Sequence, residues 1–352
     1  MIIRWLYDSI LEEIRDTARL QLVTAEILRS HRFGHHLVVI DRKLAIFLNK
    51  LEISGEDKAM LNRLAGDYTQ NGNIHLQAAV YIDIINSLTN EISRDPKSYS
   101  MSLGYVLNSR VLEPTTLLLE NLHNDGWLYD EIFKYVATKN RLISFKYTGT
   151  HGGGDDIPNI LSAVIGEGRI ALTLIDSDAA APSSRPKDKL SRLKQVSQSV
   201  NPEISHIQSL PVREIENLIP LEVILKLPCA ANNSTNEVLL RIRDHEINNE
   251  HPLMDHFCLY FDYKVGIPIP RPGQLDDEET RWIRDKLRIG GIILGDEVVS
   301  GYGSTIVNQL RNANALTAAF HERIRHKDWV NRYLEFFSNL IWYFVSARRL
   351  VT

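Results

Sequence analysis

The sequence has little cysteine, no excess of basic charge and no long apolar run. Only Cys229 and Cys258 among its 352 residues are cysteines, which excludes a disulfide scaffold and a multi-cysteine zinc module. Lys and Arg number 40 and Asp and Glu number 44, so the formal charge of −4 excludes a protein that coats nucleic acid through uniform positive charge. No stretch reaches the roughly 20 apolar residues that span a bilayer, and no signal-peptide pattern is present. We expect a reduced, soluble, cytoplasmic protein without a membrane partner.

Apolar spacing divides the chain into three regions. Apolar residues recur at three- and four-residue steps over 2–27, 41–51, 54–64 and 75–92, which predicts a helical N-terminal domain over 1–110. Residues 111–270 alternate short apolar runs with helical patterns, which is typical of a parallel α/β sheet flanked by helices. Residues 271–352 are predicted to be mostly helical and to end in a helical tail over 315–350.

Within the middle region, apolar runs predict strands over 115–119, 142–147, 170–175 and 204–210. Helices are predicted over 125–138 and 157–165. The glycine-rich segment 151–156 either lets the backbone approach a phosphate or a metal site, or is a plain turn. It is not a Walker motif, because no Lys-Ser or Lys-Thr follows at the required spacing, and no such motif occurs elsewhere in the chain.

Acidic residues follow two of the predicted strands. Glu120 ends the first, and Asp176 and Asp178 follow a later one, with a spacing that points both aspartates the same way along an extended segment. In an open α/β sheet, sites gather outside the carboxyl ends of the strands. Clustered carboxylates repel one another unless a cation neutralises them, and hard oxygen ligands suit Mg²⁺ or Mn²⁺. The alternative is that these acids only cap the helices that follow.

Five segments in a fixed order extend this pattern. They are Leu117-Leu118-Leu119-Glu120-Asn121, the glycine-rich segment, Leu174-Ile175-Asp176-Ser177-Asp178, Arg213-Glu214-Ile215-Glu216-Asn217 and Tyr260-Phe261-Asp262-Tyr263-Lys264. The order resembles the TOPRIM domain, in the nuclease form found in OLD-family (overcoming lysogenization defect) proteins and related bacterial anti-phage effectors. The resemblance covers about residues 114–266 and implies a TOPRIM-like, Rossmannoid sheet.

The resemblance implies roles for individual residues. Glu120, Asp176, Asp178 and Glu216 would hold two Mg²⁺ or Mn²⁺ ions, and Lys264 would assist catalysis. The family has a glycine after its first glutamate and a second acid four residues on. Here Asn121 follows and Asp125 lies five residues on, so Asp125 is a ligand candidate outside the family spacing. Glu216 is preferred over Glu214, because two residues is a poor helical spacing and the two acids would face different directions on a helix.

A basic cluster follows the two aspartates. It consists of Arg185, Lys187, Lys189, Arg192 and Lys194, opposed only by Asp188. Such a cluster could neutralise nucleic-acid phosphates beside a metal site, or it could be a solvated helix face.

These features predict a metal-dependent endonuclease that hydrolyses phosphodiester bonds in DNA or RNA. The resemblance suggests an antiviral defence effector, and since the chain lacks the ATPase of OLD proteins, any ATPase or sensor would be a separate partner. The helical ends could form a homodimer or pack on the core. Two alternatives stay open: a TOPRIM primase- or topoisomerase-like nucleotidyl transfer, and a non-catalytic adaptor whose acids are caps.

Overall fold

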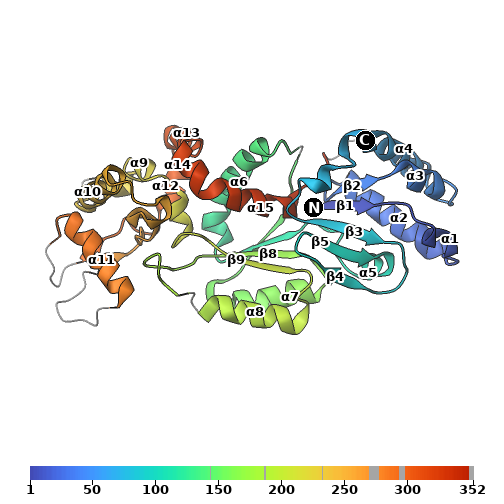
Figure 1. Cartoon of the computed structure of the whole chain (residues 1–352), viewed down its shortest axis with the longest axis horizontal. Helices are drawn as coiled ribbons and strands as arrows, with labels where there is room; N and C mark the ends of the chain where they lie inside the picture. Colours follow the sequence, from blue (N-terminus) through green and yellow to red (C-terminus); the bar gives the residue numbers. More distant parts are fainter. Residues whose placement is uncertain (143, 186–187, 232, 269–276, 293–297, 349–352) are drawn as a thin grey trace.

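Two α/β sheets lie side by side along the molecule, followed by a mostly helical region (Figure 1). The computed structural model describes residues 1–142, 144–185, 188–231, 233–268, 277–292 and 298–348. In this part of the chain a single apolar core includes residues of both sheets and of the C-terminal helices. No helix within these residues combines the length and the apolar character that a membrane crossing requires.

The first sheet corrects the prediction of a helical N-terminal domain. It has five strands in the order β2-β1-β3-β5-β4, all parallel except β4: β1 Ile2–Trp5, β2 Leu37–Ile40, β3 Tyr81–Ile85, β4 Ile92–Arg94 and β5 Ser98–Ser102. The predicted helix over 2–27 therefore begins with a strand, and the one over 75–92 contains β3. β1 lies inside the sheet between β2 and β3, and apart from the half-buried Arg4 its residues are apolar and buried, so this short strand carries no clear alternation that marks it.

Helices of the N-terminal region follow the predicted pattern more closely. They are α1 Ile10–Glu13, α2 Thr17–Arg32, α3 Arg42–Leu48, α4 Gly55–Asn71 and α5 Leu103–Asn108. The Ser54 side chain accepts a hydrogen bond from Asp57 N and caps α4, as a serine before an amphipathic run should.

The second sheet confirms the prediction of a parallel α/β architecture for the middle of the chain. Its order is β7-β6-β8-β9, and every pair is parallel: β6 Thr116–Leu119, β7 Thr148–His151, β8 Ala171–Ile175 and β9 Ser205–Ser209. β6 and β8 are buried along their whole length, because α6 Leu122–Lys139 covers one face and α7 Ile157–Gly166 with α8 Asp188–Val200 covers the other (Figure 1). The strand predicted over 142–147 was wrong in position, since β7 begins at Thr148.

The region after the second sheet is mostly helical, and its helices begin well before residue 271, where the predicted helical region starts. It contains α9 Leu221–Ile224, α10 Thr235–Asn248, α11 Glu278–Ile289, α12 Ile306–Asn312, α13 Asn314–Arg323, α14 Lys327–Trp329 and α15 Glu335–Ile341, with a small antiparallel pair β10 Gly266–Pro268 and β11 Val298–Ser300. The tail predicted as one helix is broken after α13, and a π-helical turn over Val330–Leu334 joins α14 to α15.

The last described segment closes back onto both sheets. Val345 pairs with Phe145 as an isolated antiparallel bridge, and Ser346 N donates to Ser144 O at 3.1 Å. Ala347 N donates to His36 O, just before β2. The buried Phe344 ring lies 5.3 Å from the Phe133 ring of α6, centroid to centroid. The C-terminal segment therefore joins the two sheets rather than forming a separate tail.

Arg94 of β4 makes a second link between the sheets. Its guanidinium donates to Ser205 O at 2.8 Å and to His206 Nδ1 at 3.0 Å, both on β9. It also donates to the Tyr343 hydroxyl at 3.3 Å and lies over the Tyr99 ring. One half-buried cation thus connects the edge of the first sheet, the edge of the second and the C-terminal segment.

Replacing Arg94 should destabilise the folded protein. We expect Arg94→Met to lower the free energy of unfolding by about 1–3 kcal/mol, because the partly buried acceptors on β9 lose their donor. Urea denaturation measures the change. Lys97→Met, at an exposed position between β4 and β5, is the control and should change stability by less than about 0.5 kcal/mol. Equal effects of the two substitutions would contradict the linking role.

Candidate carboxylate–lysine site

The second sheet brings Glu120 and Asp176 together. Leu119 of β6 stands opposite Leu174 of β8, so the acids that follow these strands emerge at the same edge. Asp176 N donates to Glu120 Oε1 at 3.3 Å. Asn121, not Glu120, caps α6 by accepting from Asn124 N, which leaves the glutamate side chain available to this edge.

The glycine-rich segment supports the end of β6. Gly152 N donates to Leu119 O at 2.7 Å and Gly154 N to Glu120 O at 3.4 Å. A Cβ on Gly152 would lie 2.8 Å from Leu119 O, so only glycine allows this approach. The segment is thus a close-packed turn against the strand end that carries Glu120.

Asp178 lies beside Asp176 in an unusual backbone conformation. Its φ of 52° is in the left-handed region, which is uncommon for a residue other than glycine. Its N–H donates to Arg213 O at 2.9 Å, which ties the loop after β8 to the segment that precedes Glu214. Asp176, Asp178 and Lys189 line a small cavity of about 120 Å³.

Glu214 and Glu216 both lie beside Lys264, so the expectation that they face different directions was wrong, while the preference for Glu216 as a metal ligand stays a prediction. Lys264 Nζ lies 3.1 Å from Glu216 Oε2 and 3.4 Å from Glu214 Oε2. Glu214 is extended and only the following residues, Ile215–Leu218, form a 3₁₀ turn, so the helical spacing argument does not apply. Asn217 stabilises the turn: its side-chain oxygen accepts from Glu214 N, and its amide donates to Cys258 O and Phe261 O.

Asp262 positions the lysine and was not identified from the sequence. Its Oδ1 accepts from Lys264 N at 3.0 Å and from Val265 N at 2.7 Å, which forms a tight turn. Its other oxygen accepts from Arg213 at 2.9 Å. Through these contacts Asp262 fixes the backbone of Lys264, whose side chain lies beside the two glutamates. The spacing of Asp262 and Lys264 is the one sequence signal for this, since Asp commonly accepts from backbone two residues on.

Lys189 pairs with Glu120, the acid at the end of β6. Its ammonium donates to Glu120 Oε2 at 2.6 Å, and both side chains are about one-fifth exposed. Burial lowers the pKa of Lys189, but Glu120 more than offsets it and the pKa is raised overall. Among the other basic residues of the predicted cluster, Arg185, Arg192 and Lys194 are exposed, and Arg192 lies 3.7 Å from Asp155. Lys187 lies outside the described residues.

Burial and mutual repulsion perturb the acids of the cluster. Burial raises the pKa of Asp176 well above its ordinary value, Glu120 adds to the rise, and Lys264 opposes it. Burial, followed by Glu216, raises the pKa of Asp125 to about 7. Burial alone would lower the pKa of Lys264, but the carboxylates of Glu216, Glu214 and Asp176 raise it overall. Asp125, in the first turn of α6, therefore shares the electrostatic environment of the other acids despite its unusual spacing.

The acids of the cluster are chemically suited to bind a hard divalent cation. Their arrangement, however, is that of carboxylates paired with lysines. All the acids offer carboxylate oxygens, and Glu214 Oε2 and Glu216 Oε2 are buried without a directed hydrogen bond. Within the described residues, however, no three His, Cys, Asp or Glu side chains are placed to ligate one ion. Instead, the ammonium groups of Lys189 and Lys264 compensate the charge of these acids.

Comparison of the chain with protein-family models, with curated proteins and with solved structures finds no match.

The raised pKa of Asp125 predicts a pH-dependent gain in stability for Asp125→Asn. The folded state holds this proton up to about pH 7 whereas the unfolded chain releases it near 3.8, so this group makes stability fall as the pH rises through that interval. In EDTA, Asp125→Asn should be more stable than the parent by about 2–4 kcal/mol at pH 8. The difference should vanish near pH 4. Urea denaturation at the two pH values measures it.

The matched control is Asp67→Asn, a half-exposed position on α4. It should behave like the parent at both pH values. An Asp125→Asn effect that is independent of pH would show that packing, not ionisation, accounts for it.

Proposed function

We propose that this protein is a divalent-metal-dependent nuclease of the TOPRIM type, which hydrolyses phosphodiester bonds. The observation that supports the proposal is the convergence of acids from separate segments at the carboxyl edge of an all-parallel sheet. Glu120, Asp176 and Glu216 are separated by up to 96 residues in the chain, yet all three raise the pKa of the same buried neighbour, Tyr129. Strongly perturbed acids gathered at such an edge are more typical of a functional site than of solvated caps.

Each residue has a role in this proposal. Glu120, Asp176, Asp178 and Glu216, with Asp125 beside them, would hold one or two Mg²⁺ or Mn²⁺ ions. Bound ions of this kind activate water and stabilise the charge of a phosphodiester undergoing displacement. Lys264, aligned by Asp262, would stabilise the negative charge that develops on the phosphate. Lys189 and the exposed Arg185, Arg192 and Lys194 would bind neighbouring phosphates of the nucleic acid.

A cleavage assay tests the proposal. With Mg²⁺ or Mn²⁺ the parent protein should cut plasmid DNA or RNA, and Asp176→Ala should reduce the rate at least about 100-fold because a central carboxylate is lost. Asp67→Asn should cut like the parent. Cleavage that persists in Asp176→Ala protein would contradict the proposal, as would the absence of cleavage with either metal on both substrates.

Metal binding requires Lys189 to leave Glu120, and this gives a second prediction. Lys189→Met removes the competing ammonium, so Mn²⁺ should bind about five- to tenfold more tightly than to the parent, as measured by isothermal titration calorimetry at pH 8. Lys194→Met, at an exposed position of the same helix, should leave the affinity unchanged. Equal affinities for the Lys189 variant and the parent would contradict a site in which lysine and metal compete.

The ion pairs themselves favour a second candidate function. Lys189 and Lys264 already compensate Glu120, Glu214 and Glu216, as expected of a non-catalytic adaptor in which the cluster only stabilises the fold. In that case Mn²⁺ would produce neither heat nor a thermal shift, because only a ligand of the native state raises its stability. The same titration therefore distinguishes the two functions.

A cellular role follows from the nuclease proposal. The protein would act in the cytoplasm as an anti-phage effector, controlled by a separate ATPase or sensor protein, and as a homodimer if its helical regions associate. Co-purification with a nucleotide-hydrolysing partner would support this arrangement.

A further inference from the structure

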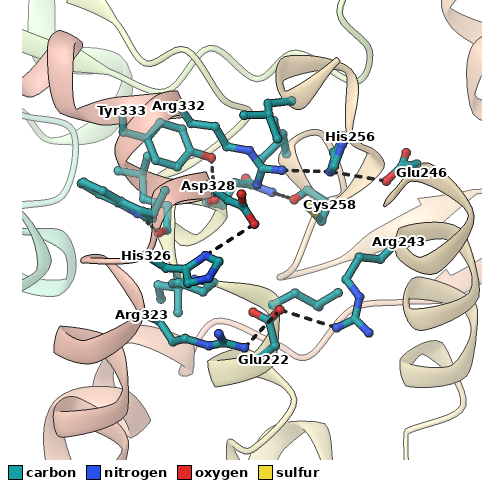
Figure 2. A pocket seen from close by; sticks show the side chains of 18 of the residues that line it. Glu222, Arg243, Glu246, His256, Cys258, Arg323, His326, Asp328, Arg332 and Tyr333 are labelled. Carbon is teal, nitrogen blue, oxygen red and sulfur yellow. Dashed lines mark hydrogen bonds and ion pairs between the residues drawn. The ribbon is translucent and has the colours of Figure 1, made fainter. Parts of the chain in front are cut away.

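A cavity of about 300 Å³ adjoins the turn that follows Glu214, but neither Glu214 nor Glu216 lines it (Figure 2 shows the cavity). Asn217 and Leu218 form part of its wall, and α10, the segment before Lys264 and the C-terminal helices form the remainder. Its volume is at the lower end of the range for small-molecule pockets.

Arg332 is the unusual group of this cavity. Its guanidinium points into the space beside His256 (Figure 2) and donates to His256 Nδ1 at 2.9 Å. Burial and the arginine itself lower the pKa of His256, so the histidine is neutral at pH 7 and leaves the charge of Arg332 uncompensated. Arg332 Nε is buried without an acceptor, and no carboxylate of the described residues lies within ion-pair distance of the guanidinium.

The acids around the cavity have other partners. Glu246 is buried and paired with Lys286. Glu222 lies between two guanidinium groups, 3.6 Å from Arg243 and 3.5 Å from Arg323. Asp328 lies at the exposed mouth, 3.5 Å from His326. Arg332 thus has no carboxylate partner among the described residues, whereas Glu222 and Glu246 are paired with cations and the other two acids of the lining, Glu250 and Asp328, are exposed.

Apolar side chains form about half of the wall beside the charged and polar ones. Leu218, Ile219, Leu221, Leu253, Leu259 and Trp329 line the cavity. An arginine next to such apolar side chains suits an organic anion, whose charged group and apolar body can both make contacts, better than a free inorganic ion.

We propose that this cavity binds a small organic anion, with one carboxylate or phosphate group on Arg332 and an apolar body against the leucine-rich wall. A guanidinium presents parallel donors that match either anion. The proposal does not depend on the chemistry of the carboxylate cluster.

Saturation-transfer NMR and calorimetry with matched probes test it. Indole-3-acetate and phenyl phosphate represent the two anions, indole-3-acetamide and phenol their uncharged counterparts, and inorganic phosphate the charge without the body. At least one organic anion should bind at least tenfold more tightly than its uncharged counterpart and than inorganic phosphate. Equal binding of the members of both pairs, or no binding of either anion at 5 mM, would overturn the proposal.

Variants assign the binding to this cavity. Arg332→Gln should weaken the anion at least tenfold, and Arg325→Gln, an exposed neighbour, should change the affinity less than twofold. Leu253→Trp leaves Arg332 in place but fills the cavity from a half-exposed position, and should also weaken binding at least tenfold. It decides the question if Arg332→Gln does not fold. Unchanged binding to Leu253→Trp protein would place the anion elsewhere and overturn the proposal.

Discussion

Compensation of clustered negative charge by two ammonium groups is the interaction on which the rest of the site depends. Carboxylates about 4 Å apart repel by about 4 kcal/mol at an effective dielectric near 20. Lys264 offsets this repulsion at Glu214 and Glu216, and Lys189 offsets it at Glu120. Four segments must therefore keep their positions together: the ends of β6 and β8, the 3₁₀ turn after Glu214, and the turn at Asp262.

Three of these four segments are held by neighbouring side chains that bond to backbone groups. Asn121 caps α6 beside Glu120, Asn217 closes the turn between Glu214 and Glu216, and Asp262 closes the turn around Lys264. A neighbouring residue supplies the local stabilisation in each case. The charged groups are consequently free to interact with one another across the edge of the sheet.

The sequence is informative where strands are buried on both faces. β6 and β8 follow from continuous apolar runs between helical patterns, and the meeting of Glu120 with Asp176 follows from their adjacent parallel strands. β1 was missed because its four residues, Ile-Ile-Arg-Trp, stand directly before a helical pattern and are too few to show a strand period. Pairing of β3 with β1 and β5 is non-local, so nothing within 75–92 reveals it.

Two features of the site depend on side-chain geometry that periodicity cannot supply. Glu214 reaches Lys264 because the backbone is extended there, although the spacing suggested opposite helical faces. Lys189 was predicted as a nucleic-acid contact, yet in the structure it pairs with Glu120. Whether Lys189 pairs with Glu120 or with a phosphate depends on the negative charge of the nearby acids. A run of basic residues in the sequence does not show where those acids lie.

The closure by Phe344, Ser346 and Ala347 has a consequence for synthesis. During translation both sheets leave the ribosome before the segment that bonds to Ser144 and His36 has been synthesised. Until then the aromatic surface around Phe133 lacks one of its covering rings, and the contact between Phe133 and Phe344 cannot form before residue 344 has been synthesised. Nascent chains stalled before residue 344 are therefore the species in which chaperone dependence and aggregation should concentrate.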